Sequence, residues 1–242
     1  TIIKSTLLLL MLAQLTFGYG FTYTGPSYAT VNFGSSTASA TFGFTYLDGE
    51  NIVWPRLAIL IDGDLVSGSV TNRTTPSSYT MNLTPGEHTI GFYLYELGET
   101  ELDPEILHQQ ETTTVNVRVK VKVQNNFIGG DIYVDNTTPS KTSPYYRTSS
   151  KNSTFVVGAI DQTYDNYPRI WNTNGTNNSD WKEDIGNGFE HMTYSRNTTY
   201  TVADWNTSTV VQANLRKVCN LTFANSYNGI SSTGTIKVNG TT

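Results

Sequence analysis

Alternation of apolar and polar residues runs through most of this chain and predicts β-strands. Within 115–123 every second residue is valine, so this stretch predicts one uninterrupted strand with one buried face. The same pattern predicts strands over 28–33, 38–46, 57–61, 79–83, 88–94, 132–134, 145–147, 154–160 and 199–202. No segment shows the spacing of an amphipathic helix. The predicted fold class is therefore all-β.

Turn signals separate several of these strands. Asp62-Gly63 predicts a hairpin turn after 57–61. Thr84-Pro85-Gly86 predicts a second hairpin between 79–83 and 88–94, because proline fixes φ and glycine supplies the turn. The stretch 161–188 is rich in Asn, Asp, Gly and Trp and predicts long loops broken by one strand near 169–171.

A repeat with a period near 100 residues organises the second half of the chain. Residues 121–127 align with 221–227, with apolar matches at Val121/Leu221 and Val123/Phe223. The match resumes between 130–138 and 234–242. This period, combined with strand-type alternation, predicts tandem β-domains rather than one compact enzyme.

We therefore expect two tandem β-sandwich domains, at 21–117 and 118–216, with the start of an incomplete third repeat at 217–242. Because the alternation of 115–123 crosses the first boundary, no flexible linker is expected there. Leu215 and Cys219 share the parity of 211–213, so the second boundary is expected to behave in the same way. Cys219 is accordingly predicted to be a small buried hydrophobic residue, with an intermolecular disulfide as the alternative.

The N-terminal segment 1–20 has the layout of a secretory signal peptide. Lys4 precedes an apolar run over 7–13, and small residues follow at Gly18 and Gly20. The run is too short to span a bilayer, so no stable membrane span is expected. A retained segment would have to be buried in a groove of its own domain or of a neighbouring copy, and the sequence leaves both alternatives open.

Composition points to a secreted protein. Charged residues make up 14% of the 242 residues, well below the usual quarter, and polar Thr, Ser, Asn and Gly take their place. The net charge of −5 gives no electrostatic support for binding nucleic acid. A single cysteine, Cys219, excludes an intrachain disulfide, so packing and strand pairing must supply the stability.

Asn-x-Ser/Thr sequons are twice as frequent as composition explains. With 22 asparagines, and Ser plus Thr at roughly a quarter of the chain, chance gives about five, and ten are present. Asn82 is the weakest acceptor because Pro85 follows its threonine. The excess favours N-glycosylation in a secreted context over compositional accident. The predicted sites are Asn72, Asn136, Asn152, Asn174, Asn177, Asn197, Asn206, Asn220 and Asn239.

Catalytic and metal-binding signals are weak. The three histidines, His88, His108 and His191, form no metal-ligand motif, and His88 is expected at the surface. Glu190-His191 stands near further acids in sequence, at Asp180, Glu183 and Asp184, which is a weak acid–base signal. Six acids between Glu96 and Glu111 predict a solvated loop or short helix, with a Ca²⁺ site as the alternative. No nucleotide-binding fingerprint occurs. The sequence therefore predicts no catalytic residue, cofactor or metal, and a protein that is not an enzyme.

Aromatic residues gather in the second predicted domain. Trp171, Trp181 and Trp205 lie there with Tyr164 and Tyr167. Such rings either pack in a core or interface, or form a platform that stacks on sugars.

The second domain resembles the Ig-like β-sandwich repeats of prokaryotic surface proteins. The resemblance rests on 121–135, 143–145, 158–160, 197–202 and 212–216, and extends into the copy that begins at Val218. Such modules resemble adhesin stalks and subunits of extracellular filaments. The resemblance implies a structural role outside the cell.

Two functions are therefore expected as alternatives. The first is a structural subunit of a glycosylated extracellular filament, in which copies of the chain join head-to-tail by strand complementation. The second is a fragment of a tandem-repeat adhesin or carbohydrate-binding surface stalk. The expected partners are copies of the chain itself and covalent N-linked glycans. In the filament, apolar side chains from both ends would form the joint: Leu7, Leu8, Leu9, Leu10, Leu221, Phe223, Ile236 and Val238.

Overall fold

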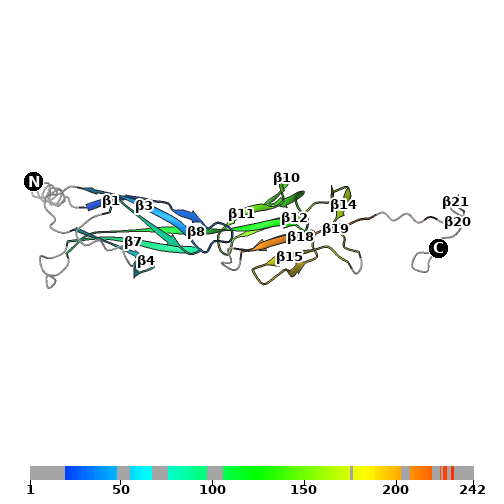
Figure 1. Ribbon diagram of the computed structural model, residues 1–242. Coiled ribbons are helices and arrows are strands. Elements are labelled where there is room, and N and C mark those ends of the chain that lie inside the picture. The colour runs from blue at the N-terminus through cyan, green and yellow to red at the C-terminus, as the bar shows by residue number, and fades with distance from the viewer. Residues whose placement is uncertain are drawn as a thin grey trace, which may run out of the picture.

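The computed structural model describes residues 20–47, 55–66, 76–96, 106–174, 177–202 and 208–219, together with 224, 226–227 and 230–231. Across these ranges the fold is all-β, as predicted, and contains no helix. Figure 1 shows an elongated molecule in which two groups of strands follow one another along a common axis. The long strand β8 (Ile106–Asn125) belongs to both groups.

The first group is a sandwich of two sheets. One sheet has the order β1-β3-β6, made of β1 (Gly20–Thr24), β3 (Ala38–Leu47) and β6 (Ser78–Leu83). The other has the order β5-β4-β7-β8, made of β4 (Pro55–Ile61), β5 (Asp64–Leu65), β7 (Gly86–Glu96) and the first half of β8. A short strand, β2 (Tyr28–Thr30), runs parallel to β8.

Aromatic rings fill the space between these two sheets. Phe92 of β7 lies at the centre, with its ring centroid 5.1 Å from that of Phe42 and 5.2 Å from that of Phe44, both on β3. Phe21 of β1 meets Phe92 edge-on at 6.4 Å. These offset and T-shaped contacts are the preferred geometries of aromatic pairs. The alternating residues of β3 and β7 therefore form one core, as their sequence pattern predicts.

The second group is also a two-sheet sandwich. One sheet has the order β10-β9-β12-β17, made of β9 (Asp131–Val134), β10 (Asn136–Thr142), β12 (Thr154–Ala159) and β17 (Asn197–Thr201). The other has the order β16-β15-β18-β8, made of β15 (Asp180–Asp184), β16 (Glu190–Thr193), β18 (Val210–Asn214) and the second half of β8, with β11 (Tyr145–Ser149) also paired to β8.

Two smaller sheets complete the described strands. β13 (Gln162–Tyr164), β14 (Tyr167–Ile170) and β19 (Arg216–Lys217) form one of them, beyond the second sandwich. β20 (Ser226–Tyr227) and β21 (Ile230–Ser231) pair with each other in the other.

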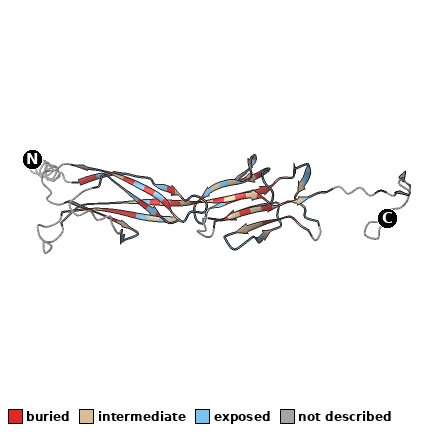
Figure 2. Ribbon diagram, viewed as in Figure 1, coloured by how far each residue is buried: buried red, intermediate tan, exposed pale blue. Residues whose placement is uncertain are grey.

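Strand β8 supplies one face to both cores. Val115 and Val117 pack in the first core, whereas Val119, Val121 and Val123 pack in the second. All five are at most 1% exposed, and the residues between them are only partly buried, an alternation visible along β8 in Figure 2. Because side chains of a strand alternate between its faces, both cores lie on the same face of β8. The uninterrupted strand predicted over 115–123 is thus observed.

The structure corrects three sequence-based predictions about strands and turns. Thr84-Pro85-Gly86 is not a hairpin turn, because β6 pairs with β3 and β7 pairs with β4 and β8, so the turn joins the two sheets. The stretch 161–188 contains three strands rather than one, at β13, β14 and β15. The strand predicted over 28–33 ends at Thr30.

Cys219 is exposed, contrary to the prediction that it is buried. The buried parity of β18 ends at Leu215, after which the chain leaves the second core and pairs with β14 through β19. The alternation of apolar and polar residues in the sequence therefore continues after Leu215, where the chain leaves the second core.

A one-residue insertion in β8 tests the shared strand. We expect an alanine inserted after Arg118 to reverse the facing of every later residue of β8, because a one-residue slip exchanges the two faces of a strand. Removing three valines from the second core forfeits about 5 kcal/mol, comparable to the whole stability of a small domain. Thermal unfolding should then show that only the first sandwich is folded, and the near-ultraviolet signal of Trp171 and Trp181 should be lost.

The matched control is an alanine inserted between Ser35 and Ser36, which are exposed in the loop after β2 and follow the Asn32–Ser35 turn. That variant should unfold like the wild type. Two intact halves in the Arg118 insertion variant would show that β8 does not couple the cores.

Candidate functional site

A groove opens where the two sandwiches meet along β8. On one edge of β8, β7 begins with Gly86 opposite Val117, and β11 ends with Ser149 opposite Val119. The two strands therefore abut end to end, and the gap between them falls at Arg118. Gly86, Glu87, Asn116, Ser150 and Lys151 line this groove, whose volume is about 510 Å³.

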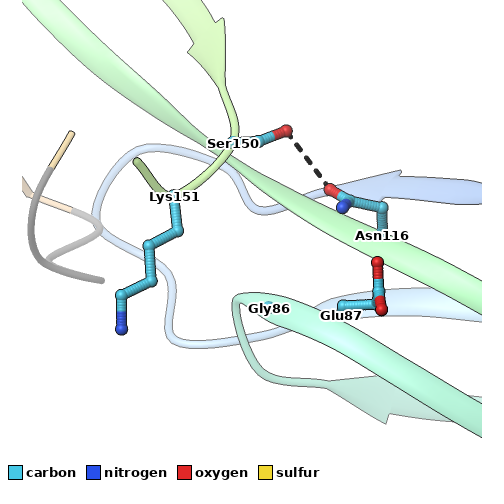
Figure 3. A pocket seen from close by; sticks show the side chains of 5 residues that line it. All are labelled: Gly86, Glu87, Asn116, Ser150 and Lys151. Carbon is cyan, nitrogen blue, oxygen red and sulfur yellow. Dashed lines mark hydrogen bonds between the residues drawn. The ribbon is translucent and has the colours of Figure 1, made fainter. Parts of the chain in front are cut away.

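The groove is polar and draws on both sandwiches. Figure 3 shows Ser150 and Lys151 on one side and Gly86 and Glu87 on the other, with Asn116 between them. The Ser150 hydroxyl donates to the Asn116 side-chain oxygen at 3.3 Å. A carboxylate, an amide, a hydroxyl and an ammonium group together can bind a ligand that both donates and accepts hydrogen bonds.

Two further contacts cross the junction. The rings of Phe33, after β2, and Tyr146 of β11 meet edge-on at 5.5 Å. The Lys120 ammonium donates to the Asn32 side-chain oxygen at 3.3 Å. Each contact is modest in energy, so the continuous strand remains the main connection between the sandwiches.

A second, smaller groove lies at the far end of β8, with a volume of about 340 Å³, and Asn125 is one of its lining residues. The side-chain amide of Asn125 donates to the carbonyls of Gly129 and Asp131 at 3.1 and 3.2 Å. These bonds close the turn between β8 and β9, in which Gly129 has a φ of 85° that favours glycine. Asn125 is 3% exposed, and its side-chain oxygen has no hydrogen-bond partner. We assign Asn125 a structural role in closing this turn.

The predicted glycosylation sites within the described ranges lie on polar loops and strand ends. Asn174 and Asn177 are exposed in one loop, where the side-chain amide of Asn172 donates to both of their carbonyls. Asn197 is exposed at the start of β17, and Asn136 begins β10. Asn152 is exposed in the turn between β11 and β12.

Several predicted residues lie outside the described residues. Among the sequons these are Asn72, Asn206, Asn220 and Asn239; among the predicted interface residues they are Leu7, Leu8, Leu9, Leu10, Leu221, Phe223, Ile236 and Val238.

Two of the three clustered tryptophans are core residues. Trp181 is fully buried and Trp171 is 8% exposed, and their ring centroids lie 6.0 Å apart. Their indole N–H groups donate to the carbonyls of Arg196 and Tyr194. These two rings are therefore closed to a sugar, while Trp205 lies outside the described residues.

The weak acid–base signal around His191 has a structural explanation. His191 Nδ1 lies 3.1 Å from one carboxylate oxygen of Asp180, whose other oxygen accepts from the Asn214 side chain at 2.7 Å. The Tyr200 hydroxyl donates to the Glu183 carboxylate. These contacts tie β15 to β16, β17 and β18. Within the described ranges, no group of three metal-binding side chains occurs.

His88 is more buried than predicted, with 12% of its side chain exposed. Nδ1 lies 2.7 Å from the Asp62 carboxylate and Nε2 lies 2.8 Å from the Thr84 carbonyl oxygen. Both partners can only accept, so each bond uses a proton on the ring nitrogen that makes it. His88 thereby joins the β4–β5 turn to the β6–β7 turn.

The Asp62 carboxylate is stabilised in its charged form. Burial alone would raise its pKa, but the hydrogen bonds from His88 and from the Thr89 amide, together with the charge of His88, lower the pKa below its ordinary value of 3.8. A carboxyl group whose pKa falls on folding stabilises the fold above its ordinary pKa and loses that contribution as the pH drops through the folded pKa.

Comparisons with known proteins identify no family. No family model matches the sequence, and none of the curated proteins matches it. Among solved structures, the chain is similar to the fibronectin(III)-like modules of CbhA from Clostridium thermocellum, at 20% identity and a TM-score of 0.29 over 40% of this chain and 96% of that one. It is also similar to the CARDB domain of PF1109 from Pyrococcus furiosus, at 20% identity and a TM-score of 0.28 over 42% of this chain and 96% of that one. Both scores lie below 0.5, so the fold assignment rests on the sheets themselves. In the part of the chain that the structure describes, no helix is long and apolar enough to cross a membrane.

Neutralising Asp62 tests the contact through which His88 joins the β4–β5 turn to the β6–β7 turn. We expect Asp62→Asn to lower the free energy of unfolding at neutral pH by about 1 kcal/mol or less, since the pair is partly exposed. The difference from the wild type should vanish as the pH falls below 3.8 through the folded pKa of Asp62. Urea unfolding at several pH values measures both effects.

Asp64→Asn, at an exposed position of β5, is the matched control and should leave stability unchanged. A constant difference between Asp62→Asn and wild type across the whole pH range would contradict the assignment.

Proposed function

We propose that this chain is a structural, non-enzymatic subunit of a glycosylated extracellular filament, assembled head-to-tail by strand complementation between copies. The observation that carries the proposal is β8, a single 20-residue strand shared by two cores. Sandwiches joined in this way bend less than sandwiches joined by a flexible tether. Stiffness along one axis is a property that a fibre needs and that a soluble binding module does not.

The side chains that line the two grooves support a structural role. The groove at the junction and the groove at the end of β8 are lined mainly by polar, uncharged or singly charged groups. The carboxylates of Asp180 and Glu183 are both bonded to neighbouring strands. These two carboxylates thus hold neighbouring strands together, as a structural subunit requires.

Strand complementation is the proposed joint. An apolar segment that enters a neighbouring sheet gains ladder hydrogen bonds, which set its direction and register. It also covers apolar area, at about 25 cal/mol per Å². The leucine-rich segment 1–20 is the proposed donor, and the repeat beginning near residue 217 is the proposed acceptor.

The alternative function is a fragment of a tandem-repeat adhesin or surface stalk. The repeat between 121–127 and 221–227 favours it, because an array of similar units would continue the same rod. The two functions differ in what joins successive units: separate chains in the filament, and one covalent chain in the stalk.

Electron microscopy of the purified secreted protein tests the joint. We expect fibres from the full-length chain and none after deletion of residues 1–20 from the secreted form, because the proposed donor is then absent. Fibres of unchanged length after the deletion would remove this segment from the joint. A full-length chain that stays monomeric at high concentration would refute the filament and favour the stalk.

Glycosylation has its own test. We expect the native protein to exceed the 26.8 kDa of the unmodified chain in intact mass, and to lose that excess on deglycosylation. The exposed Asn152, Asn174, Asn177 and Asn197 should account for modified peptides. An intact mass that deglycosylation leaves unchanged would refute glycosylation.

A further inference from the structure

A glycosylation sequon stands on the rim of the junction groove. Ser150 and Lys151 line the groove, and Asn152-Ser153-Thr154 follows them directly. Consecutive Cα atoms are about 3.8 Å apart, so a glycan on Asn152 would start one residue from the groove wall. Asn152 is exposed, with a left-handed φ of 59°, and its backbone N–H donates to the Val202 carbonyl at 2.8 Å. Its backbone is therefore fixed at this place.

We propose that an N-linked glycan on Asn152 folds back into the groove and bridges the two sandwiches. This inference rests on the proposed glycosylation. Sugar hydroxyls both donate and accept hydrogen bonds, and the groove offers the acceptor Glu87, the donor Lys151 and the two-way partners Asn116 and Ser150. Its volume of about 510 Å³ lies within the usual range of small-ligand sites.

Because the glycan would be covalently attached beside the groove, weak contacts between its sugars and the lining residues would be enough to hold it there. A short covalent link holds a ligand at an effective concentration in the millimolar range. A groove with only millimolar affinity for a few sugar residues would then be filled for much of the time. Exposed polar side chains such as Glu87 give weak hydrogen bonds of this kind, because water competes for them.

Asn152 differs in this respect from the other described acceptors. Asn174 and Asn177 lie in the loop before β15, and Asn197 begins β17 opposite Gly158, at the other end of β12 from Thr154. Asn136 begins β10 and is likewise separated along the chain from the lining residues, so a glycan on any of these four would begin away from the groove. Asn82 lies four residues before Gly86, but it is the weakest acceptor because Pro85 follows its threonine. The bridging role therefore falls to Asn152, whose glycan would link the end of β11 to the start of β7.

Three variants of the full-length chain, produced with native glycosylation, separate the possibilities. Thr154→Val removes the sequon and keeps Asn152, which tolerates its left-handed backbone better than most residues. Thr199→Val removes the Asn197 sequon and is the matched control, because both threonines are exposed on neighbouring strands of one sheet. Glu87→Ala keeps every sequon and removes the groove carboxylate.

Glycopeptide mass spectrometry measures occupancy, and hydrogen exchange measures protection of residues 86–87 and 150–153 beside the gap. We expect Thr154→Val and Glu87→Ala to speed this exchange about two- to ten-fold, as expected from loss of a tethered ligand of millimolar affinity. Thr199→Val should exchange like the wild type.

The failures are distinguishable. If Asn152 carries a glycan but exchange is the same in the wild type, Thr154→Val and Glu87→Ala, the groove is empty and only this inference falls. If other sequons are occupied and Asn152 is not, this inference also falls while the proposed glycosylation stands. If no sequon is occupied, both are refuted.

Discussion

The facing of alternate residues along β8 is the constraint on which the rest of the structure depends. Five valines from Val115 to Val123 must all turn to the same side, and each is buried in one of two separate cores. Burying a valine contributes about 1.5–3 kcal/mol, so neither core can give up its share without losing much of its stability. The strand cannot slip by one residue, because a slip would place every valine in water. The relative position of the two sandwiches is therefore fixed through one strand rather than through a broad interface.

Strands on both sides of β8 follow from this shared element. β7 pairs with residues 106–117 and β11 with residues 119–123, so these two antiparallel strands meet end to end. β2 pairs with residues 116–118 and β18 with residues 122–125, both in parallel. Each sandwich closes around its own half of β8. The second half of β8 pairs with β18, a strand that lies far from it in the sequence, at residues 210–214.

Structural features that depend only on neighbouring residues were predicted correctly from the sequence. The valine alternation identified β8, and Asp62-Gly63 forms the predicted hairpin turn, with φ values of 55° and 93° that suit these residues.

Features that depend on pairing partners far away in the sequence were not predicted correctly. Thr84-Pro85-Gly86 specifies a turn, but nothing in those residues tells whether the flanking strands pair with each other or with different sheets. The strand predicted near 169–171 is observed as β14, whereas β13 and β15 were not predicted. β15 pairs with β18, about 30 residues later, and a local pattern does not show that partner. The junction groove joins three separate segments, and only the sequon at Asn152 marked one of them in advance.

The end-to-end arrangement of β7 and β11 on β8 also makes the junction the least supported part of the two sandwiches. Between Arg118 and Val119 the pairing partners of β8 change: β2 ends opposite Arg118, β7 begins opposite Val117, and β11 ends opposite Val119. At this point the described contacts between the sandwiches are the backbone of β8 and the side-chain contacts of Phe33 with Tyr146, Asn32 with Lys120 and Asn116 with Ser150. A sheet resists bending through its hydrogen-bonded neighbours, so a change of neighbours on both edges concentrates bending there. Groups that bridge the gap between Gly86 and Ser150 act on this point alone, without touching either core. In the proposed filament, a few weak polar contacts in the groove would therefore affect bending at the junction, although they would add little to the stability of either sandwich.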